Sequence, residues 1–211
     1  MDAGRHVEIG ELRQGDAAGA AQARQLLNVA LGDGMYSIRG ILSDAADPTA
    51  GVWLARRPDG AAGAGPAVAA AIARLLVPED AAYYQRFGPA AVSLFGRTVG
   101  SFEALAVDLA WRRRGIGAGL TRASLDWLRR QGCAVAVAIS WLSGRPESSP
   151  ELFRHLGFAE GRTVERFYER ESVENDWSCP VCGQPCRCAA TLFTLPLDAA
   201  GGDAGRGPGA A

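Results

Sequence analysis

The residues Ala104-Leu-Ala-Val-Asp-Leu-Ala-Trp-Arg-Arg-Arg-Gly-Ile-Gly-Ala-Gly-Leu120 decide the fold of this chain. An apolar segment leads into three consecutive arginines and then into glycines at positions 115, 117 and 119, where an amphipathic stretch begins. Glycine leaves the backbone accessible to a bulky anion, and the first N–H groups of a helix are unpaired and lie at its positive end. The segment therefore predicts a cradle for a phosphate or pyrophosphate between a strand and a helix.

Two common phosphate-binding loops do not fit this segment. A Walker loop ends in Gly-Lys-Ser/Thr, but this chain has no lysine, so all 22 of its basic residues are arginine. A dinucleotide fingerprint needs a third glycine at the position of Leu120. It also needs an acidic residue about 20 positions further on, where this chain has Ile139, Ser140 and Trp141. Both alternatives are excluded.

The pattern Arg112-x-x-Gly115-x-Gly117 after a strand resembles the acetyl-CoA pyrophosphate loop of the GNAT acyltransferase superfamily. An apolar strand at residues 133–139 and the sequence Glu151-Leu-Phe-Arg-His-Leu-Gly-Phe158 are similar to the next strand, short helix and Leu-Gly-Phe of that family. The resemblance covers residues 101–197. It implies an α/β (α+β) fold, a GNAT-like single domain with a central mixed, mostly antiparallel sheet that is flanked by helices and splayed at the cofactor cleft.

Length and composition agree with one such domain. The chain has 211 residues, of which 48 % are hydrophobic, and a net charge of −1, values that are ordinary for a globular protein. The near-neutral charge gives no electrostatic case for a nucleic-acid partner. No apolar run reaches the roughly 18 residues of a membrane span, and the N-terminus has no long apolar run. We therefore expect a cytoplasmic protein without a membrane partner.

The rest of the pattern predicts further elements in the family's order. A short strand at 6–9 and a helix at 17–30 precede strands at 51–55 and 67–76, which a Gly/Ala-rich loop at 58–66 separates. The alanine-rich run at 67–76 could be taken for a helix, and only the family order and a few β-branched residues favour a strand. The last two strands are expected at 161–168 and 189–195. The domain is predicted to span 1–197, and the Gly/Ala-rich tail at 198–211 to be disordered.

The resemblance places the acetyl-CoA site in the segment quoted above. Backbone groups of Leu105 and Val107 would hold the pantetheine arm and polarise the acetyl carbonyl. The loop and the first helical turn would hold the pyrophosphate, through Arg112, Arg113, Arg114, Gly115, Ile116, Gly117, Ala118 and Gly119. The resemblance also implies a cosubstrate, acetyl-CoA, and an amine acceptor that is a small molecule or a peptide. It leaves a homodimer open.

Glu103 is the candidate catalytic base, because the family often carries a glutamate just before the pantetheine-binding residues. Strand alternation predicts that its side chain shares the face of Leu105 and Val107. The alternative is a solvated carboxylate at the edge of a strand. His155 is one of only two histidines, and its place on the short helix predicts a surface residue.

Phe153 is where the sequence departs from the family. A tyrosine commonly stands there and protonates the departing thiolate, whereas a phenyl ring can pack on the CoA arm but cannot donate a proton. An asparagine often found upstream is also absent, with Pro146 near its place. Water, Ser149 or Tyr168 would then supply the proton. The alternative is a catalytically weak module that binds or senses CoA, or that docks a partner.

Four of the five cysteines lie close together in Trp177-Ser-Cys-Pro-Val-Cys-Gly-Gln-Pro-Cys-Arg-Cys188. Cys-Pro-x-Cys-Gly is typical of a knuckle that directs two thiolates at one metal, so Cys179, Cys182, Cys186 and Cys188 predict a structural zinc site. The alternatives are two disulfides, which the cytoplasm disfavours, and redox-active thiols. The insertion at 177–189 would order the loop between the last two strands and border the acceptor side of the cleft. Trp127 and Cys133 are expected in the core.

Overall fold

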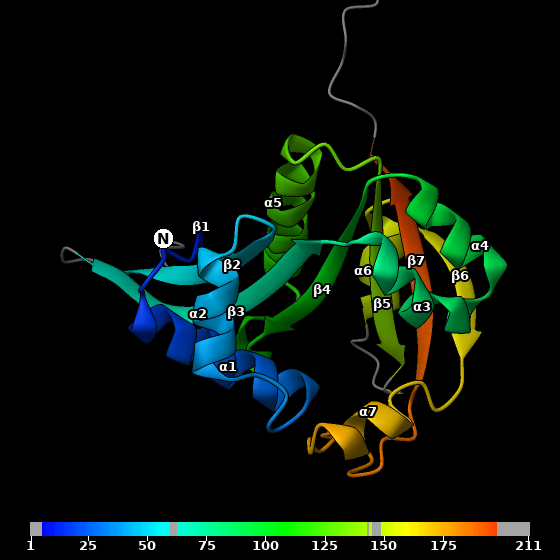
Figure 1. Cartoon of the computed structure of the whole chain (residues 1–211). Coiled ribbons are helices and arrows are strands. Elements are labelled where there is room, and N and C mark those ends of the chain that lie inside the picture. Colours follow the sequence, from blue (N-terminus) through cyan, green and yellow to red (C-terminus); the bar gives the residue numbers. More distant parts are fainter. Residues whose placement is uncertain (1–5, 60–62, 143, 145–148, 198–211) are drawn as a thin grey trace, which may run out of the picture.

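The computed structural model describes residues 6–59, 63–142, 144 and 149–197. Their centre is a seven-stranded open sheet with the strand order β1-β2-β3-β4-β5-β7-β6 (Figure 1). Only β4 and β5 are parallel neighbours, and the other pairs are antiparallel. The strands are β1 (Glu8–Glu11), β2 (Ala50–Asp59), β3 (Gly63–Leu75), β4 (Val99–Val107), β5 (Val135–Leu142), β6 (Ala159–Val164) and β7 (Ala189–Pro196). The predicted mixed, mostly antiparallel sheet is confirmed.

Helices cover both faces of this sheet. They are α1 (Ala17–Leu31), α2 (Ile38–Ala46), α3 (Ala81–Tyr84), α4 (Pro89–Ser93), α5 (Ile116–Arg130), α6 (Ser149–His155) and α7 (Glu169–Glu174), with 3-10 turns at Pro78–Asp80, Gln85–Phe87, Leu94–Gly96 and Leu109–Trp111. One face packs against α5 and α6. The other packs against α1 and α2 over β2 to β4, and against α3 and α4 near β5 and β7. No helix of the described residues is long and apolar enough to cross a membrane.

The central helix α5 shows why this sequence packs on the sheet. Its buried side includes Leu120, Trp127 and Leu128, which share one core cluster with strand residues and with Cys133. Trp127 is 6 % exposed and Cys133 is 4 % exposed, so both are core residues as predicted. The buried hydroxyl of Ser124 donates to the carbonyl of Leu120 one turn earlier, at 3.1 Å. The helix thereby satisfies its own polar side chains within the apolar interface.

The sheet splits between its two parallel strands. β4 and β5 pair only from Val99 with Val135 to Phe102 with Ala138, although both strands continue beyond that point. On the other side of β4, Phe102 pairs with Ala73 and Ala104 pairs with Ile72, so Glu103 is the extra residue of a β-bulge. A bulge bends its strand and increases its twist. The predicted splay is therefore present, and it begins at Glu103.

Several details differ from the sequence prediction. The segment predicted as a loop at 58–66 is largely strand, because β2 runs to Asp59 and β3 starts at Gly63. The alanine-rich run is a strand, as the family order predicted. β6 ends at Val164 rather than at residue 168, and α2, α3, α4 and α7 were not predicted. The tail at 198–211 lies outside the described residues.

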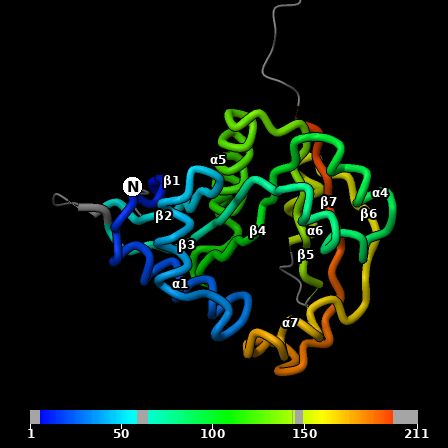
Figure 2. Tube along the Cα trace, in the orientation of Figure 1, coloured from blue at the N-terminus to red at the C-terminus, as the bar shows by residue number. Residues whose placement is uncertain are grey.

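Two segments that are far apart in the sequence meet on one side of the molecule. The trace in Figure 2 brings the segment after α1 close to the segment after α7, beside the gap between β4 and β5. Asp33 and Ser178 form an antiparallel bridge there, with both backbone N–H to carbonyl distances at 3.1 Å. The loop between α1 and α2 is therefore fixed to the cysteine-containing segment, which lies between β6 and β7.

Candidate functional site

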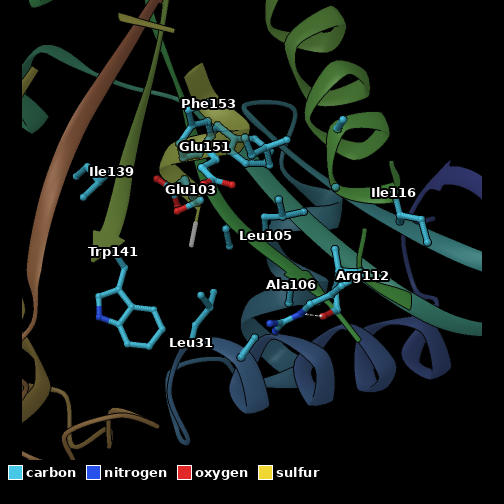
Figure 3. A pocket seen from close by; sticks show the side chains of 18 of the residues that line it. Leu31, Glu103, Leu105, Ala106, Arg112, Ile116, Ile139, Trp141, Glu151 and Phe153 are labelled. Atoms are coloured by element: carbon cyan, nitrogen blue, oxygen red, sulfur yellow. Dashed lines mark hydrogen bonds between the residues drawn. The ribbon is translucent and has the colours of Figure 1, made fainter. Parts of the chain in front are cut away.

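A cleft of about 730 Å3 occupies the gap where β4 and β5 diverge. One wall carries the β4 residues 103–107, and Ile139 and Trp141 project from β5 on the opposite wall (Figure 3). The first turn of α5 closes one end of the cleft. Residues of α1, the α1–α2 loop and the β6–β7 segment close the other end. The predicted loop and the predicted strand thus meet in one cavity.

The start of α5 has the geometry of an anion cradle. Gly115 is its N-cap in the left-handed region, at φ 78°, and no side chain caps the helix there. The N–H of Gly119 donates to the carbonyl of Gly115 at 2.9 Å, which is the first hydrogen bond of the helix. The backbone N–H groups of the turn before Gly119 therefore have no acceptor within the helix. The Nε of Arg112 donates to the carbonyl of Val107 at 3.0 Å, which ties the arginine loop to the end of β4 (Figure 3).

Most of the residues predicted to bind the cofactor line this cleft. They are Leu105, Val107, Arg112, Arg113, Gly115, Ile116, Gly117, Ala118 and Phe153. Arg114 and Gly119 are not in the described lining. The guanidinium of Arg114 lies 4.8 Å from the ring centroid of Trp111 and donates to the carbonyl of Ala110. Gly119 faces β1, where an added Cβ would stand 2.7 Å from Ile9 Cδ1. These two residues hold the loop and the helix in place.

Glu103 lies in the cleft, but on a different face from the one predicted. Leu105 and Val107 pack toward α5, whereas the Glu103 carboxylate pairs with Arg74 of β3 at 3.0 Å. Arg74 also binds Asp44 of α2 at 3.0 Å, on the side covered by α1 and α2. Simple alternation fails here because Glu103 is the bulged residue.

The surroundings of Glu103 favour a base with an elevated pKa. Burial raises the pKa of Glu103, and the guanidinium of Arg74 opposes that shift. Its side chain is still 34 % exposed, so the carboxylate is reached from the cleft. A carboxylate whose pKa is raised accepts a proton more effectively than an ordinary glutamate.

Phe153 is both a cleft residue and a core residue. It is 3 % exposed, and its ring packs against Phe102, Phe158 and Phe193 with centroids 5.1 to 6.0 Å apart. Both hydroxyl groups considered as replacements for the missing tyrosine line the same cleft. Ser149 Oγ lies 2.7 Å from Ser140 Oγ of β5, and burial raises the pKa of Tyr168, which keeps its phenol protonated.

His155 is exposed, as predicted for a surface residue, but it also lines the mouth of the cleft.

The four clustered cysteines form a compact thiol group. Their Sγ atoms all lie within 4.8 Å of one another, and three of the sulfur pairs are separated by 3.6, 3.8 and 3.9 Å. Four sulfurs at about 2.3 Å from a central zinc in a tetrahedron would be about 3.8 Å apart, whereas a disulfide needs about 2.05 Å. The donor set and its spacing therefore fit a tetrahedral metal, and all five cysteines are free thiols.

Backbone N–H groups face the sulfurs in this cluster. Val181 N lies 3.4 Å from Cys179 Sγ, and Arg187 N lies 3.1 Å from Cys182 Sγ. Such donors stabilise thiolate charge, because a hydrogen bond to an anionic acceptor is stronger than one to a neutral acceptor. Cys186 N donates to Ser172 Oγ at 2.9 Å, which anchors the cluster to α7.

Sequence reasoning missed the wall at the far end of the cleft. It consists of Leu31, Met35, Tyr36, Trp141, Tyr168 and Trp177. Of these residues, the sequence predicts Tyr168 only as a possible proton donor, and it places Trp177 in the insertion that is predicted to border the acceptor side of the cleft. These residues come from the α1–α2 region, β5 and the β6–β7 segment, and nothing in their spacing along the chain predicts that they meet. The one available signal was Trp177, two residues before the first clustered cysteine, Cys179.

With this geometry in place, comparisons with known proteins assign the family. The sequence pattern of the Acetyltransferase (GNAT) family matches residues 47–158, more than half of the chain. The chain belongs to the GNAT acetyltransferase family. It is therefore an acyltransferase, and acetyl-CoA is the donor that the family uses. A search of curated proteins finds no match to this acetyltransferase.

Solved structures share the fold of this acetyltransferase at low identity. Arabidopsis thaliana NAA60 in complex with a bisubstrate analogue has a TM-score of 0.65 and 14 % identity, covering 92 % of this chain and 100 % of its own. The NatC complex bound to Gag peptide and CoA gives 0.63 and 16 %, covering 91 % and 99 %. The ribosomal-protein-S18-alanine N-acetyltransferase from Escherichia coli gives 0.58 and 18 %, covering 93 % and 97 %. At these identities the likeness establishes the fold.

Proposed function

We propose that this acetyltransferase transfers the acetyl group of acetyl-CoA to a primary amine. The observation that carries the proposal is the cleft, which joins an open helix N-terminus, the unpaired edge of β4 and the Glu103 carboxylate. Among solved structures with the same fold, the NatC complex is bound to Gag peptide and CoA, and two others are a ribosomal-protein-S18-alanine N-acetyltransferase and an agmatine N-acetyltransferase. We therefore expect an amine acceptor that is a small molecule or a peptide.

The residues divide the work along the cleft. The N–H groups at the start of α5, together with Arg112 and Arg113, bind the pyrophosphate. Backbone groups of Leu105 and Val107 hold the pantetheine arm and orient the thioester, where a backbone N–H stabilises the charge that develops on the carbonyl oxygen. Acetyl-CoA supplies the activated acetyl group.

Glu103 takes the proton that the attacking amine must lose, directly or through one water. A nitrogen–carbon bond forms, the carbon–sulfur bond breaks, and the departing thiolate takes a proton from Ser149, Tyr168 or water. Phe153 contacts the arm but supplies no proton.

The cysteines have a structural role in this proposal. Cys179, Cys182, Cys186 and Cys188 would hold one zinc ion, since four thiolates complete its coordination sphere and leave no open position for chemistry. No step of the transfer passes through this site.

A direct assay tests the transfer. Purified protein is incubated with acetyl-CoA and a panel of primary amines, and the release of CoA thiol is followed together with the mass of the product. We expect thiol release that requires both protein and amine, and that falls strongly in Glu103→Gln.

The packing of Phe153 among three other phenylalanine rings favours a second candidate, a module that binds CoA without turnover. That candidate predicts tight CoA binding with no amine-dependent thiol release for any member of the panel.

A further inference from the structure

The wall opposite the cradle carries aromatic and apolar side chains from three separate parts of the chain. We call it the aromatic wall and define it as Met35, Tyr36, Trp141, Tyr168 and Trp177. None of these residues is charged. The carboxylate beside this wall is that of Glu103 on β4, and it is already paired with Arg74. The wall therefore offers a large apolar surface beside a single reactive position.

The cysteine cluster supports this wall directly. Trp177, Cys179 and Cys186 form one buried cluster, against which Met35, Trp141 and Tyr168 pack. Trp177 is 5 % exposed, and its ring meets that of Tyr168 edge to face at a centroid distance of 6.1 Å. Trp141 and Cys188 pack against this same cluster. The side chains that line the cleft are thus the same ones that cover the thiols.

The α1–α2 loop joins the wall through tight backbone contacts. Asp33 and Ser178 exchange two backbone hydrogen bonds of 3.1 Å. Beside this bridge, a Cβ added at Gly32 would stand 3.0 Å from the Trp177 ring. The loop that carries Met35 and Tyr36 is therefore held in position by the cysteine-containing segment.

A second, more open cavity continues beyond the wall. It shares Tyr36 and Trp177 with the first cleft and is lined by polar residues, which include Asn28, Asp33 and Gln184. A group that extends past the wall would enter a polar, solvent-open space of about 550 Å3. The apolar surface is consequently confined to the part of an acceptor next to its amine.

These contacts select one kind of acceptor. An aromatic or bulky apolar group gains free energy by leaving water against this wall, and ring pairs add to that gain. A second ammonium group in the same place would be buried without a counter-charge, which is unfavourable. We propose that the acceptor is a primary amine borne next to an aromatic or bulky apolar group, which lies on the aromatic wall, and that the cysteine cluster sets the geometry of this wall. The inference rests on the proposed acetyl transfer.

The test compares primary amines that differ in the chemical group attached to the amino nitrogen. The probes are phenethylamine, a tripeptide that starts with phenylalanine, ethylamine and spermidine, whose carrier holds further ammonium groups. We expect kcat/KM for the two aromatic probes to exceed that for spermidine by about tenfold or more. Whether phenethylamine or the tripeptide has the higher kcat/KM then shows whether the acceptor is a free amine or a peptide N-terminus.

Two variants examine the wall and one provides a matched control. Trp177→Ala should lower kcat/KM for phenethylamine by about tenfold or more and leave that for ethylamine nearly unchanged, and Met35→Ala should do the same to a smaller extent. Trp111→Ala changes a tryptophan at the cradle end of the same cleft. It should alter both amines equally and keep their ratio.

The outcomes separate this inference from the proposed function. Thiol release with spermidine that exceeds release with the aromatic amines, or equal losses for all amines in Trp177→Ala and Met35→Ala, would overturn the acceptor assignment alone. Absence of thiol release with every amine would remove the transferase proposal itself and the acceptor assignment with it. If Trp177→Ala fails to fold, as judged by acetyl-CoA affinity, Met35→Ala carries the test.

Discussion

The two ends of the cleft are built by different means. The cradle comes from one continuous segment, in which the β4 edge, an arginine turn and the first turn of α5 present mainly backbone groups. The aromatic wall comes from side chains of three segments that are far apart in the sequence and meet over the thiols. A site of backbone groups depends on glycines at a few positions, whereas a wall of side chains depends on every contact that holds its segments together.

The largest expected effect tests the wall. Cys182→Ser removes one of the four thiolates, so the protein should lose its metal, about one equivalent in the unmodified chain. An aromatic group buries roughly 150 Å2 or more at about 25 cal/mol per Å2, so losing the wall should cost about 4 kcal/mol of acceptor binding, or about a thousandfold in kcat/KM for phenethylamine. Elemental analysis and steady-state kinetics measure the two effects.

The cradle should be indifferent to this change. Acetyl-CoA affinity, measured by calorimetry, is expected to stay as in the unmodified protein. Cys133→Ala is the matched control, because Cys133 is a buried thiol outside the cluster and should not affect metal content. Metal-free protein from a chelator-free preparation, with the four thiols titratable, would contradict the zinc assignment.

The next effect tests the cradle and should spare the wall. A Cβ at Gly117 would meet Leu105 Cδ2 at 3.5 Å, an ordinary contact, so Gly117→Val fits the fold but places methyl groups at the anion site. Losing two charge-assisted hydrogen bonds of about 1.5 kcal/mol each should weaken acetyl-CoA binding by about a hundredfold, as calorimetry would show.

Gly119→Val is the matched control in the same helical turn, because it should affect stability rather than acetyl-CoA affinity. Its side chain would crowd Ile9 of β1 rather than the cleft, so it should lower the melting temperature and leave acetyl-CoA affinity unchanged. Equal affinities in Gly117→Val and the unmodified protein would show that the start of α5 does not hold the pyrophosphate.

The smallest effect concerns the point where the two ends meet. If Glu103 accepts a proton, kcat/KM rises as pH increases through its pKa. Arg74 holds that pKa down, so Arg74→Met should move the acidic limb of the pH profile to higher pH. Asp44 and Asp80 act in the opposite direction, so Asp44→Asn should move the limb to lower pH. The limb should disappear in Glu103→Gln, and shifts of the same sign in both variants would contradict the assignment.

The sequence predicts the cradle end of the cleft well and the aromatic wall poorly. The glycines and arginines of the cradle are recognisable because a backbone anion site restricts which residues can stand at 112, 115 and 117. The strand at 67–76 was assigned correctly despite its alanines, since the family order constrained it. The aromatic wall could not be predicted, because Met35 and Trp177 come together only through the Asp33–Ser178 bridge and the packing of the cysteine segment.

Glu103 shows a third situation. Its identity as a candidate base came from its place before Leu105, but the face to which it points did not. Alternation assumes a regular strand, and one extra residue in β4 reverses the pattern for the side chain at the bulge. No local sequence signal marked that bulge, because it is set by the pairing of β4 with Ala73 and Ile72 of β3.

The Asp33–Ser178 bridge has a consequence for how the chain folds and opens. The cradle depends on contacts within one strand–helix unit, so it can form early and locally. The bridge joins segments near opposite ends of the chain, and its loop-closure entropy delays it until the sheet exists. It also belongs to the part with few strand pairings, which opens at low free energy. The amide hydrogens of Asp33 and Ser178 should therefore exchange with solvent well before those of β5. The protein can then keep acetyl-CoA bound while the acceptor side of the cleft opens locally.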